Sequence, residues 1–352
     1  MFMQRAAGRR RRQGGGGDPG IPPANVSLPT LVSTEPNLIY TAGTWTGAAS
    51  VSARLLVNAV DVGPANPSMP IQAAWRGQPC QVREVATNPD GSVPATSNTV
   101  TPATLDVLMA AALAGKVGYA FDGHDAATMF QDNLGTVPVT APGQPVGLWQ
   151  SKWGAAPITA TQATVALAPV WDGAALGFDG VDDSVGITGA ANWVGKTHVT
   201  ATVRFKMERI AGNQAIYTLW FNSNGASGLV NWHITATGQI NASVREASGG
   251  TALQAVLSAA GLVQVGVEHT LTIEIDWTTG IVLARLDGVQ VINFTLAGLT
   301  GPIAWTVNNS RFGRTAANGF TAQVDIERWV LLHEAVNPAT RDLFEAWVGE
   351  AA

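Results

Sequence analysis

Short stretches in which apolar and polar residues alternate run through the chain, and they predict β-strands. Residues 81–86 alternate in this way and lead into Asn88-Pro89-Asp90-Gly91, which favours a turn because proline fixes φ and glycine accepts positive φ. Residues 198–207 and 215–222 give the same strand signal. Further hairpin turns are expected at Thr237-Gly238, Thr279-Gly280 and Asp287-Gly288. The pattern predicts a meander of antiparallel strands.

The phase of the alternation predicts which side chains face a core, because neighbouring residues of a strand point to opposite faces. One apolar set is Leu271, Ile273, Ile275 and Trp277, which leaves Thr272, Glu274, Asp276 and Thr278 on the other face. A second set flanks a turn at Asp179-Gly180, with Leu176 and Phe178 before it and Val185 and Ile187 after it. Both sets are expected to point inward.

Two segments carry helix signals instead. Residues 104–115 are rich in Leu and Ala, with Thr104 as a cap and Gly115 as a stop. Near the carboxyl end, Asn337 is a suitable cap and Pro338 occupies a favoured first helical position. We therefore expect one short helical connector and one short carboxyl-terminal helix in a chain that is otherwise all-β.

Composition supports this fold class. The chain has 352 residues, of which 46% are hydrophobic, 13% are charged and 39 are glycine, and this favours strands and turns in more than one module. Cys80 is the only cysteine, so neither an intrachain disulfide nor a four-cysteine zinc site can form. No apolar run reaches the roughly 18 residues of a membrane span, and we expect no membrane insertion.

The first 24 residues form a separate, basic arm. Besides Arg5, the arm contains the cluster Arg9, Arg10, Arg11 and Arg12, and a glycine run at 14–17 follows, although the whole chain has a net charge of −5. Such a segment cannot form its own core. Either it lies along a neighbouring subunit or an acidic surface of an assembly, or it is a solvated tail.

Residues 25–101 contain the phrase Thr41-Ala-Gly-Thr-Trp-Thr-Gly47, and within residues 79–92 a strand ends in an Ala-Thr-Asn turn that Gly-Ser follows. In these two stretches the segment resembles the Ig-like repeats of phage and bacterial surface proteins. Trp45 and Trp75 are available to pack between two sheets. The resemblance implies a small β-sandwich.

Residues 121–149 contain the phrase Asp125-Ala-Ala-Thr-Met-Phe-Gln-Asp132, and Phe178-Asp-Gly-Val-Asp-Asp183 follows further along the chain. With these phrases the rest of the chain resembles phage-encoded laminin-G-like proteins, which have a concanavalin-A-like jelly roll. The second phrase matches the family's first core strand, and residues 322–332 and 337–347 match its closing strand and short helix. The resemblance implies a connector and lead-in at 102–170 and a jelly roll at 171–352.

Together the two resemblances imply a structural virion protein, as in head spikes, fibres and tail proteins of phages or gene-transfer agents. We expect it to be made in the bacterial cytoplasm and carried on the particle as an adhesin for host surface polysaccharide. Its expected partners are capsid or tail proteins, bound through the arm, and further copies of itself; nucleic acid is not expected. The alternatives are a particle protein that binds no ligand and a polysaccharide depolymerase.

A carboxylate pair would be required for depolymerisation, because glycoside hydrolases of this fold use two acids. Glu274-Ile-Asp-Trp-Thr-Thr279 resembles the start of one family's catalytic strand, but Thr279 stands where the third acid would be. The five histidines are scattered singly, and no phosphate-binding loop or serine nucleophile motif is present. The sequence therefore predicts a protein that is not an enzyme, with Glu274 and Asp276 on a solvated strand face.

Two ligand sites remain as hypotheses. Asp179, Asp182 and Asp183, with Asn222, offer oxygen donors for calcium, although they can equally build the turn, and no other cofactor is expected. Sugar binding needs an aromatic platform beside amides, which residues 220–224 and Asn231-Trp232-His233 supply. The predicted sugar ligands are Asn222, Asn224 and Trp232, with core packing as the alternative for the tryptophan.

Overall fold

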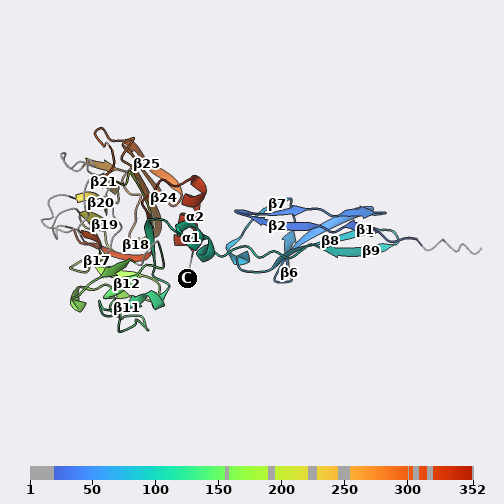
Figure 1. Cartoon of the computed structure of the whole chain (residues 1–352), viewed down its shortest axis with the longest axis horizontal. Helices are drawn as coiled ribbons and strands as arrows, with labels where there is room; N and C mark the ends of the chain where they lie inside the picture. The colour runs from blue at the N-terminus through green and yellow to red at the C-terminus, as the bar shows by residue number, and fades with distance from the viewer. Residues whose placement is uncertain are drawn as a thin grey trace, which may run out of the picture. The chain divides into compact units, whose positions relative to one another are not determined.

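The computed structural model describes residues 20–154, 158–188, 195–220, 228–244, 254–299, 301–303, 309–314 and 320–350. The chain divides into two compact units, Met1–Thr104 and Leu105–Ala352. Both consist mainly of antiparallel strands, which confirms the predicted all-β class with two short helices (Figure 1). Neither helix within these ranges is long and apolar enough to cross a membrane.

The amino-terminal unit is a sandwich of a three-stranded sheet, in the order β2-β3-β7, and a four-stranded sheet, in the order β6-β5-β8-β9. A separate pair, β1-β4, completes it. The strands are β1 Ala24–Ser27, β2 Thr30–Thr34, β3 Asn37–Thr41, β4 Thr44–Thr46, β5 Ser50–Val57, β6 Val60–Pro64, β7 Ser68–Pro70, β8 Cys80–Asn88 and β9 Gly91–Thr96, with a 3-10 turn at Ala73–Trp75. The predicted turn at residues 88–91 joins β8 to β9.

A small apolar core holds these two sheets together. Leu31 and Leu38 from one sheet meet Leu55 and Val82 from the other, and the lone Cys80 is fully buried among them. Burial raises the pKa of the Cys80 thiol, because a thiolate would lose its hydration there. Cys80 therefore acts as a small apolar core residue in this unit.

Glu84 on β8 is the polar centre of the same unit and is fully buried. Its carboxylate accepts hydrogen bonds from the Tyr40 hydroxyl, from the Gly43 backbone N–H at 2.9 Å and from the Trp45 indole N–H at 2.7 Å. Burial, and then the hydrogen bond to Glu84, raise the pKa of Tyr40. One carboxylate thus fixes β3, β4 and their connection to the four-stranded sheet.

The carboxyl-terminal unit contains two larger sheets. In the first sheet the order is β13-β10-β27-β18-β23-β24-β25, with β16 beside β27 and β15 beside β16. Its strands are β10 Gly118–Asp122, β13 Trp153–Gly154, β15 Val170–Trp171, β16 Leu176–Asp179, β18 His198–Met207, β23 Glu268–Asp276, β24 Ile281–Leu286, β25 Val289–Thr295 and β27 Gln323–Leu332.

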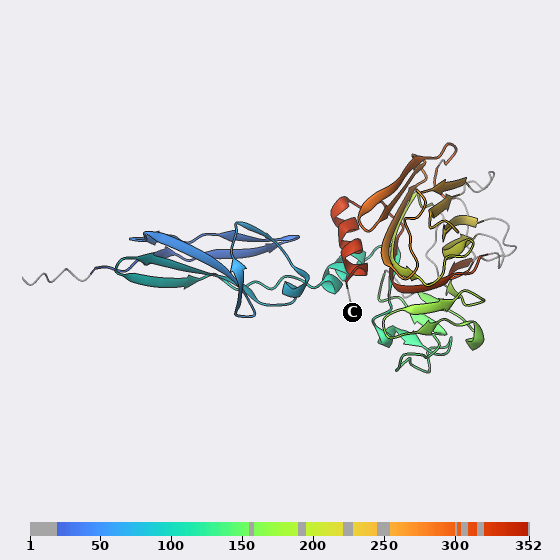
Figure 2. The ribbon, with the colours of Figure 1, turned by 180° about the vertical axis from the view of Figure 1, so that it is seen from behind.

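In the second sheet the order is β11-β12-β14-β17-β26-β19-β20-β21-β22. Its strands are β11 Met129–Phe130, β12 Leu148–Gln150, β14 Thr159–Thr161, β17 Val185–Thr188, β19 Gln214–Trp220, β20 Gly228–Ile234, β21 Ile240–Val244, β22 Gln254–Leu257 and β26 Asn309–Phe312, and the unit has 3-10 turns at Ala126–Thr128 and Val165–Leu167. Figure 2 shows this sandwich from behind.

Aromatic and aliphatic side chains from both sheets fill the space between them. Trp329 of the first sheet packs against Tyr217 and Phe312 of the second, at ring-centre distances of 4.7 and 4.9 Å. The inward positions predicted by alternation are confirmed, since all of them are buried in this core: Leu176, Phe178, Val185, Ile187, Leu271, Ile273, Ile275 and Trp277.

Two helices, α1 (Leu105–Leu113) and α2 (Pro338–Val348), lie side by side on the outer face of the first sheet (Figures 1 and 2). Their apolar residues form a second core in this unit together with outward residues of β10 and β27. The Trp347 indole of α2 donates to Asp106 of α1 at 3.0 Å. As predicted, the Asn337 side chain caps α2 and Pro338 opens it.

The predicted connector and lead-in at 102–170 is corrected by this arrangement. Helix α1 belongs to the carboxyl-terminal unit, because its buried face packs on α2 and β27. Strands β10 and β13 lie in the first sheet, and β11, β12 and β14 lie in the second. The segment is therefore an integral part of the sandwich, which begins at Leu105 and not at residue 171.

Candidate functional site

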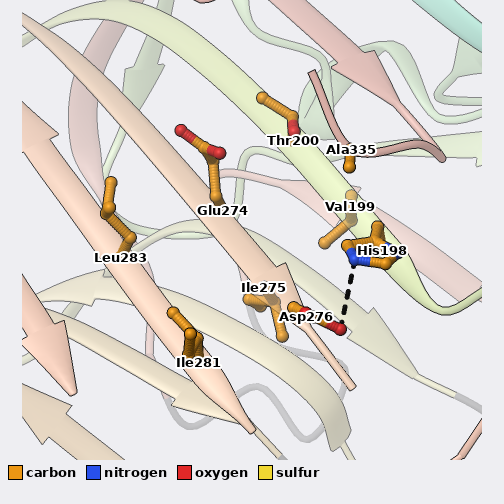
Figure 3. Close-up of a pocket in the computed structure, with 9 residues that line it drawn as sticks. All are labelled: His198, Val199, Thr200, Glu274, Ile275, Asp276, Ile281, Leu283 and Ala335. Atoms are coloured by element: carbon orange, nitrogen blue, oxygen red, sulfur yellow. Dashed lines mark ion pairs between the residues drawn. The ribbon is translucent and has the colours of Figure 1, made fainter. Parts of the chain in front are cut away.

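A hollow of about 200 Å³ opens on the outer face of the first sheet, where β18, β23 and β24 run side by side (Figure 3). His198 and Thr200 come from β18, and Glu274 and Asp276 come from β23. On the other side, β24 contributes the aliphatic side chains of Ile281 and Leu283, and Ala335 contributes its methyl group. One small cavity thus has a polar side and an apolar side.

Asp276 and His198 meet because β18 and β23 pair antiparallel with these two residues in register. The His198 Nε2 atom lies 3.2 Å from Asp276 Oδ1, and the Thr197 hydroxyl lies 2.8 Å from His198 Nδ1. Asp276 also accepts hydrogen bonds from the Thr278 N–H and hydroxyl and from the Thr279 hydroxyl. Burial raises the pKa of Asp276, but these bonds outweigh it and lower the pKa to about 2.

Glu274 is held by a residue of α2. Arg341 donates to both of its carboxylate oxygens, one bond from Nε and one of 3.2 Å from a terminal nitrogen, and the pair is partly buried. The hydrogen bond to Glu274 raises the pKa of Arg341. Asp276, which is stabilised in its charged form, can accept hydrogen bonds but is a poor proton donor at neutral pH.

The predicted orientation of Glu274 and Asp276 away from the core is confirmed, but their surroundings differ from a solvated strand face. Both side chains are only about one-fifth exposed, because α2 and the turn after β23 partly cover them. The partners His198 and Arg341 lie far away in the sequence. Strand register and helix docking bring them together, and single residues at these positions give no local motif.

The three aspartates proposed for calcium do lie together. One oxygen of each of Asp179, Asp182 and Asp183 lies within 4.8 Å of the others. Asp179 Oδ1 accepts from the N–H groups of Val181, Asp182 and Asp183, and Asp183 Oδ2 accepts from the Asp179 N–H. Burial raises the pKa of Asp183 to about 6, and the neighbouring carboxylates of Asp179 and Asp182 add to this effect. The oxygen set suits calcium, and the same side chains also build the turn.

Trp232 cannot serve as the predicted sugar platform, and this expectation is corrected. Its side chain is 2% exposed and points between the sheets, where it stacks with Tyr217 at 5.1 Å and with Trp329 at 5.7 Å. Because residues alternate along β20, its neighbours Asn231 and His233 occupy the outer face of the second sheet. The alternative that the sequence left open for Trp232, core packing, is the one that the structure shows.

The other predicted site residues lie outside the described residues. These are Asn222 and Asn224 of the proposed sugar site and Arg9, Arg10, Arg11 and Arg12 of the arm.

A second hollow, of about 280 Å³, lies on the amino-terminal unit between the edge strands β6 and β7. Its lining includes Val62, Met69 and Trp75 and contains no charged side chain. It therefore offers less means of recognising a polar ligand than the hollow in Figure 3.

Comparisons with known proteins yield structural similarity only. No family model and no curated protein matches the chain. Among solved structures, the NanB sialidase from Streptococcus pneumoniae matches with 19% identity and a TM-score of 0.37, over 43% of this chain and 24% of that one. The Ruminococcus gnavus IT-sialidase CBM40 bound to α2,3 sialyllactose matches with 16% identity and a TM-score of 0.36, over 44% and 83%. The Trypanosoma rangeli sialidase in complex with 2,3-difluorosialic acid matches with 10% identity and a TM-score of 0.46, over 91% and 62%.

The prediction that the chain is not an enzyme is corrected by these matches, because several of them are sialidases. The chain spans only about a quarter of the length of NanB. At these identities and TM-scores the similarity assigns no substrate and no activity to this chain. It is similar to sialidases and to a sialidase-associated CBM40 module.

Proposed function

We propose that this chain is a glycan-binding protein whose carboxyl-terminal unit binds a sugar residue in the hollow of Figure 3. The observation that carries the proposal is the division of this cavity into a polar and an aliphatic side. Sugars have hydroxyl groups around the ring edge and C–H groups on the ring faces, so they need both kinds of surface at once. A pocket with a few placed polar groups on an apolar wall meets this need.

The polar side of the hollow accepts hydrogen bonds far more readily than it donates them. The lowered pKa of Asp276 keeps it ionised at neutral pH, and an ionised carboxylate is an acceptor only. Glu274 adds a second carboxylate, which is paired with Arg341. Sugar hydroxyls can donate to the oxygens that Arg341 and His198 leave available, while Ile281 and Leu283 contact a ring face. The hollow therefore favours neutral or amino sugars over acidic ones, whose carboxylates would face like charges.

The size of the hollow sets the size of the ligand. The volume of the hollow is about 200 Å³. It is smaller than the roughly 300–1,000 Å³ typical of drug-sized ligands. One sugar unit of a longer chain fits this volume, so affinity for a whole polysaccharide would come from several copies binding at once.

The decisive experiment measures binding of the full chain to an array of bacterial capsule polysaccharides, with Asp276→Asn as the test variant. Asparagine keeps the size and can still hold the turn at Thr278, but it replaces one acceptor by a donor. Losing one hydrogen bond to a charged acceptor, worth about 1.5–3 kcal/mol, should weaken binding about 10- to 100-fold.

Asp61→Asn is the matched control, because Asp61 is a half-exposed carboxylate in the amino-terminal unit, where it pairs with Arg54. The control should bind like the wild type. Equal binding by the Asp276 variant, or binding of acidic polysaccharides alone, would contradict the proposal.

We further propose that this glycan binding serves attachment of a phage or phage-like particle to its host. The support for this step is the sequence resemblance to phage-encoded laminin-G-like and Ig-like proteins, together with the arginine cluster at residues 9–12. In this proposal the arm binds capsid or tail proteins and the protein forms homo-oligomers on the particle. Purified particles probed with an antibody against the chain would test it, and particles without the chain would refute it.

A further inference from the structure

Polar side chains on the outer face of the second sheet are buried. Asn231 and His233 of β20 and Asn241 and Ser243 of β21 are each between 3% and 8% exposed. Strand register places Asn231 opposite Ser243 and His233 opposite Asn241. The four residues therefore form one polar patch across two strands, on the side of the sandwich opposite to the hollow.

Two atoms of this patch have no hydrogen-bond partner. They are Asn231 Oδ1 and His233 Nδ1, within the part of the chain that the structure describes. By contrast, the Ser243 hydroxyl donates to Asn241 Oδ1 at 2.6 Å. A buried polar atom without a partner costs about 1–3 kcal/mol, and such atoms point to an absent water, ion or ligand.

The imidazole of His233 is not protonated at neutral pH, so its Nδ1 atom stays without a partner among the described residues. Burial lowers the pKa of His233 to about 4, so the ring is neutral at pH 7. Its ring also packs against Phe320, with ring centres 5.4 Å apart and an interplanar angle of 35°. The patch therefore combines uncharged hydrogen-bonding atoms with an adjacent aromatic surface.

The chemistry of the two atoms limits the group that can satisfy them. An amide oxygen only accepts, so its partner must donate, and a neutral imidazole nitrogen accepts or donates according to its tautomer. A carboxylate cannot donate to Asn231, and an ammonium group cannot accept from His233. A hydroxyl group can do both, whichever tautomer His233 adopts.

Asn231 and His233 are two residues apart on one strand, so their side chains lie on the same face with Cα atoms about 7 Å apart. Hydroxyl groups at different positions of one sugar can serve both side chains at once.

We propose that this patch is a second binding site, specific for a neutral, hydroxyl-rich ligand such as an uncharged saccharide, on the sheet opposite to the hollow. The inference does not depend on the proposed function of the hollow. It assigns Asn231 and His233 to ligand recognition, with Phe320 beside the sugar ring.

The test compares Asn231→Leu with the wild-type full chain, because leucine has nearly the same size and removes the polar atoms. Binding is measured with fluorescein-labelled dextran, mannan and galactan, and stability is measured by urea unfolding. We expect at least a tenfold loss of affinity for one of these glycans together with unchanged or increased stability. Asn293→Leu, on the exposed part of edge strand β25, is the matched control and should keep full affinity.

Three outcomes would overturn the inference. Unchanged glycan affinity in Asn231→Leu would mean that the patch holds ordered water only. A clear loss of stability would show that the amide has a structural bond. Absence of neutral-glycan binding by the wild type would refute the site directly. Asp276→Asn separates the two sites. If glycan affinity falls in Asp276→Asn but not in Asn231→Leu, the result supports binding in the hollow and contradicts the second site.

Discussion

Replacing Glu84 by alanine should be the most damaging single change in the amino-terminal unit. The carboxylate is fully buried and accepts from Tyr40, Gly43 and Trp45. Its removal leaves three partly buried donors without an acceptor, and hydrogen bonds to charged groups are worth about 1.5–3 kcal/mol each. Part of this loss is offset because the cost of burying the charge is also removed. We expect a net destabilisation of about 3–5 kcal/mol.

This magnitude would be a large fraction of the roughly 5–15 kcal/mol that stabilises a typical domain. Glu84→Gln should have a smaller effect, because one amide oxygen can still accept from Tyr40 and Gly43 while the amide nitrogen faces the Trp45 N–H. Glu35→Ala, which removes a surface ion pair with Arg76, should cost less than about 1 kcal/mol.

Hydrogen exchange of the full chain, followed by mass spectrometry, reports the stability of this unit separately from the other. Peptides that cover β3, β4 and β8 should lose most protection in Glu84→Ala, less in Glu84→Gln and least in the control Glu35→Ala. A loss below about 1 kcal/mol in Glu84→Ala would refute the reasoning, since it would mean that the three donors find other partners.

Three further predictions concern pH and assembly. The pKa of Asp276 is lowered to about 2, so the ionised Asp276 side chain should stabilise the fold fully above pH 4 and lose this effect as the pH falls towards 2. The free energies of unfolding of the wild type and of Asp276→Asn, measured with urea, should therefore become equal near pH 2. The pKa of Asp183 is raised to about 6, so its charged form destabilises the fold at pH 7. Asp183→Asn removes this charge and should stabilise the protein by about 1–2 kcal/mol at pH 7. Below pH 4 the variant should show no gain in stability over the wild type in thermal unfolding. Deleting residues 1–17 should leave unfolding unchanged but prevent incorporation into particles, and a normal particle content of the truncated chain, measured by immunoblot, would contradict this.

Strand periodicity predicted the first sheet well because its inner and outer faces differ. Along β23 the core side is aliphatic and the outer side carries Thr272, Glu274 and Asp276, so the phase could be read directly. Strand β20 gave no such contrast, since Asn231, Trp232 and His233 are all buried. A strand that is covered on both faces has no visible polar side, and this is why the sequence could not decide between sugar binding and core packing for Trp232.

Features that depend on distant residues could not be predicted. β27 pairs with β10, β16 and β18, and the residues in register with Trp329 are Phe121 and Val203. No local pattern identifies such neighbours, so residues 118–171 could not be recognised as part of both sheets. The same holds for the hollow, because Asp276 meets His198 through register and Glu274 meets Arg341 through the docking of α2.

The contact between α1 and α2 has a consequence for the synthesis of the protein. Helix α1 leaves the ribosome first among the elements of its unit, and α2, which covers it, leaves last. Until then Leu105, Met109 and Leu113 have no partner surface, and β10 also waits for β27. The unit therefore completes its folding only after α2 has been synthesised, and a product that is truncated within α2 would keep an exposed apolar surface prone to aggregation.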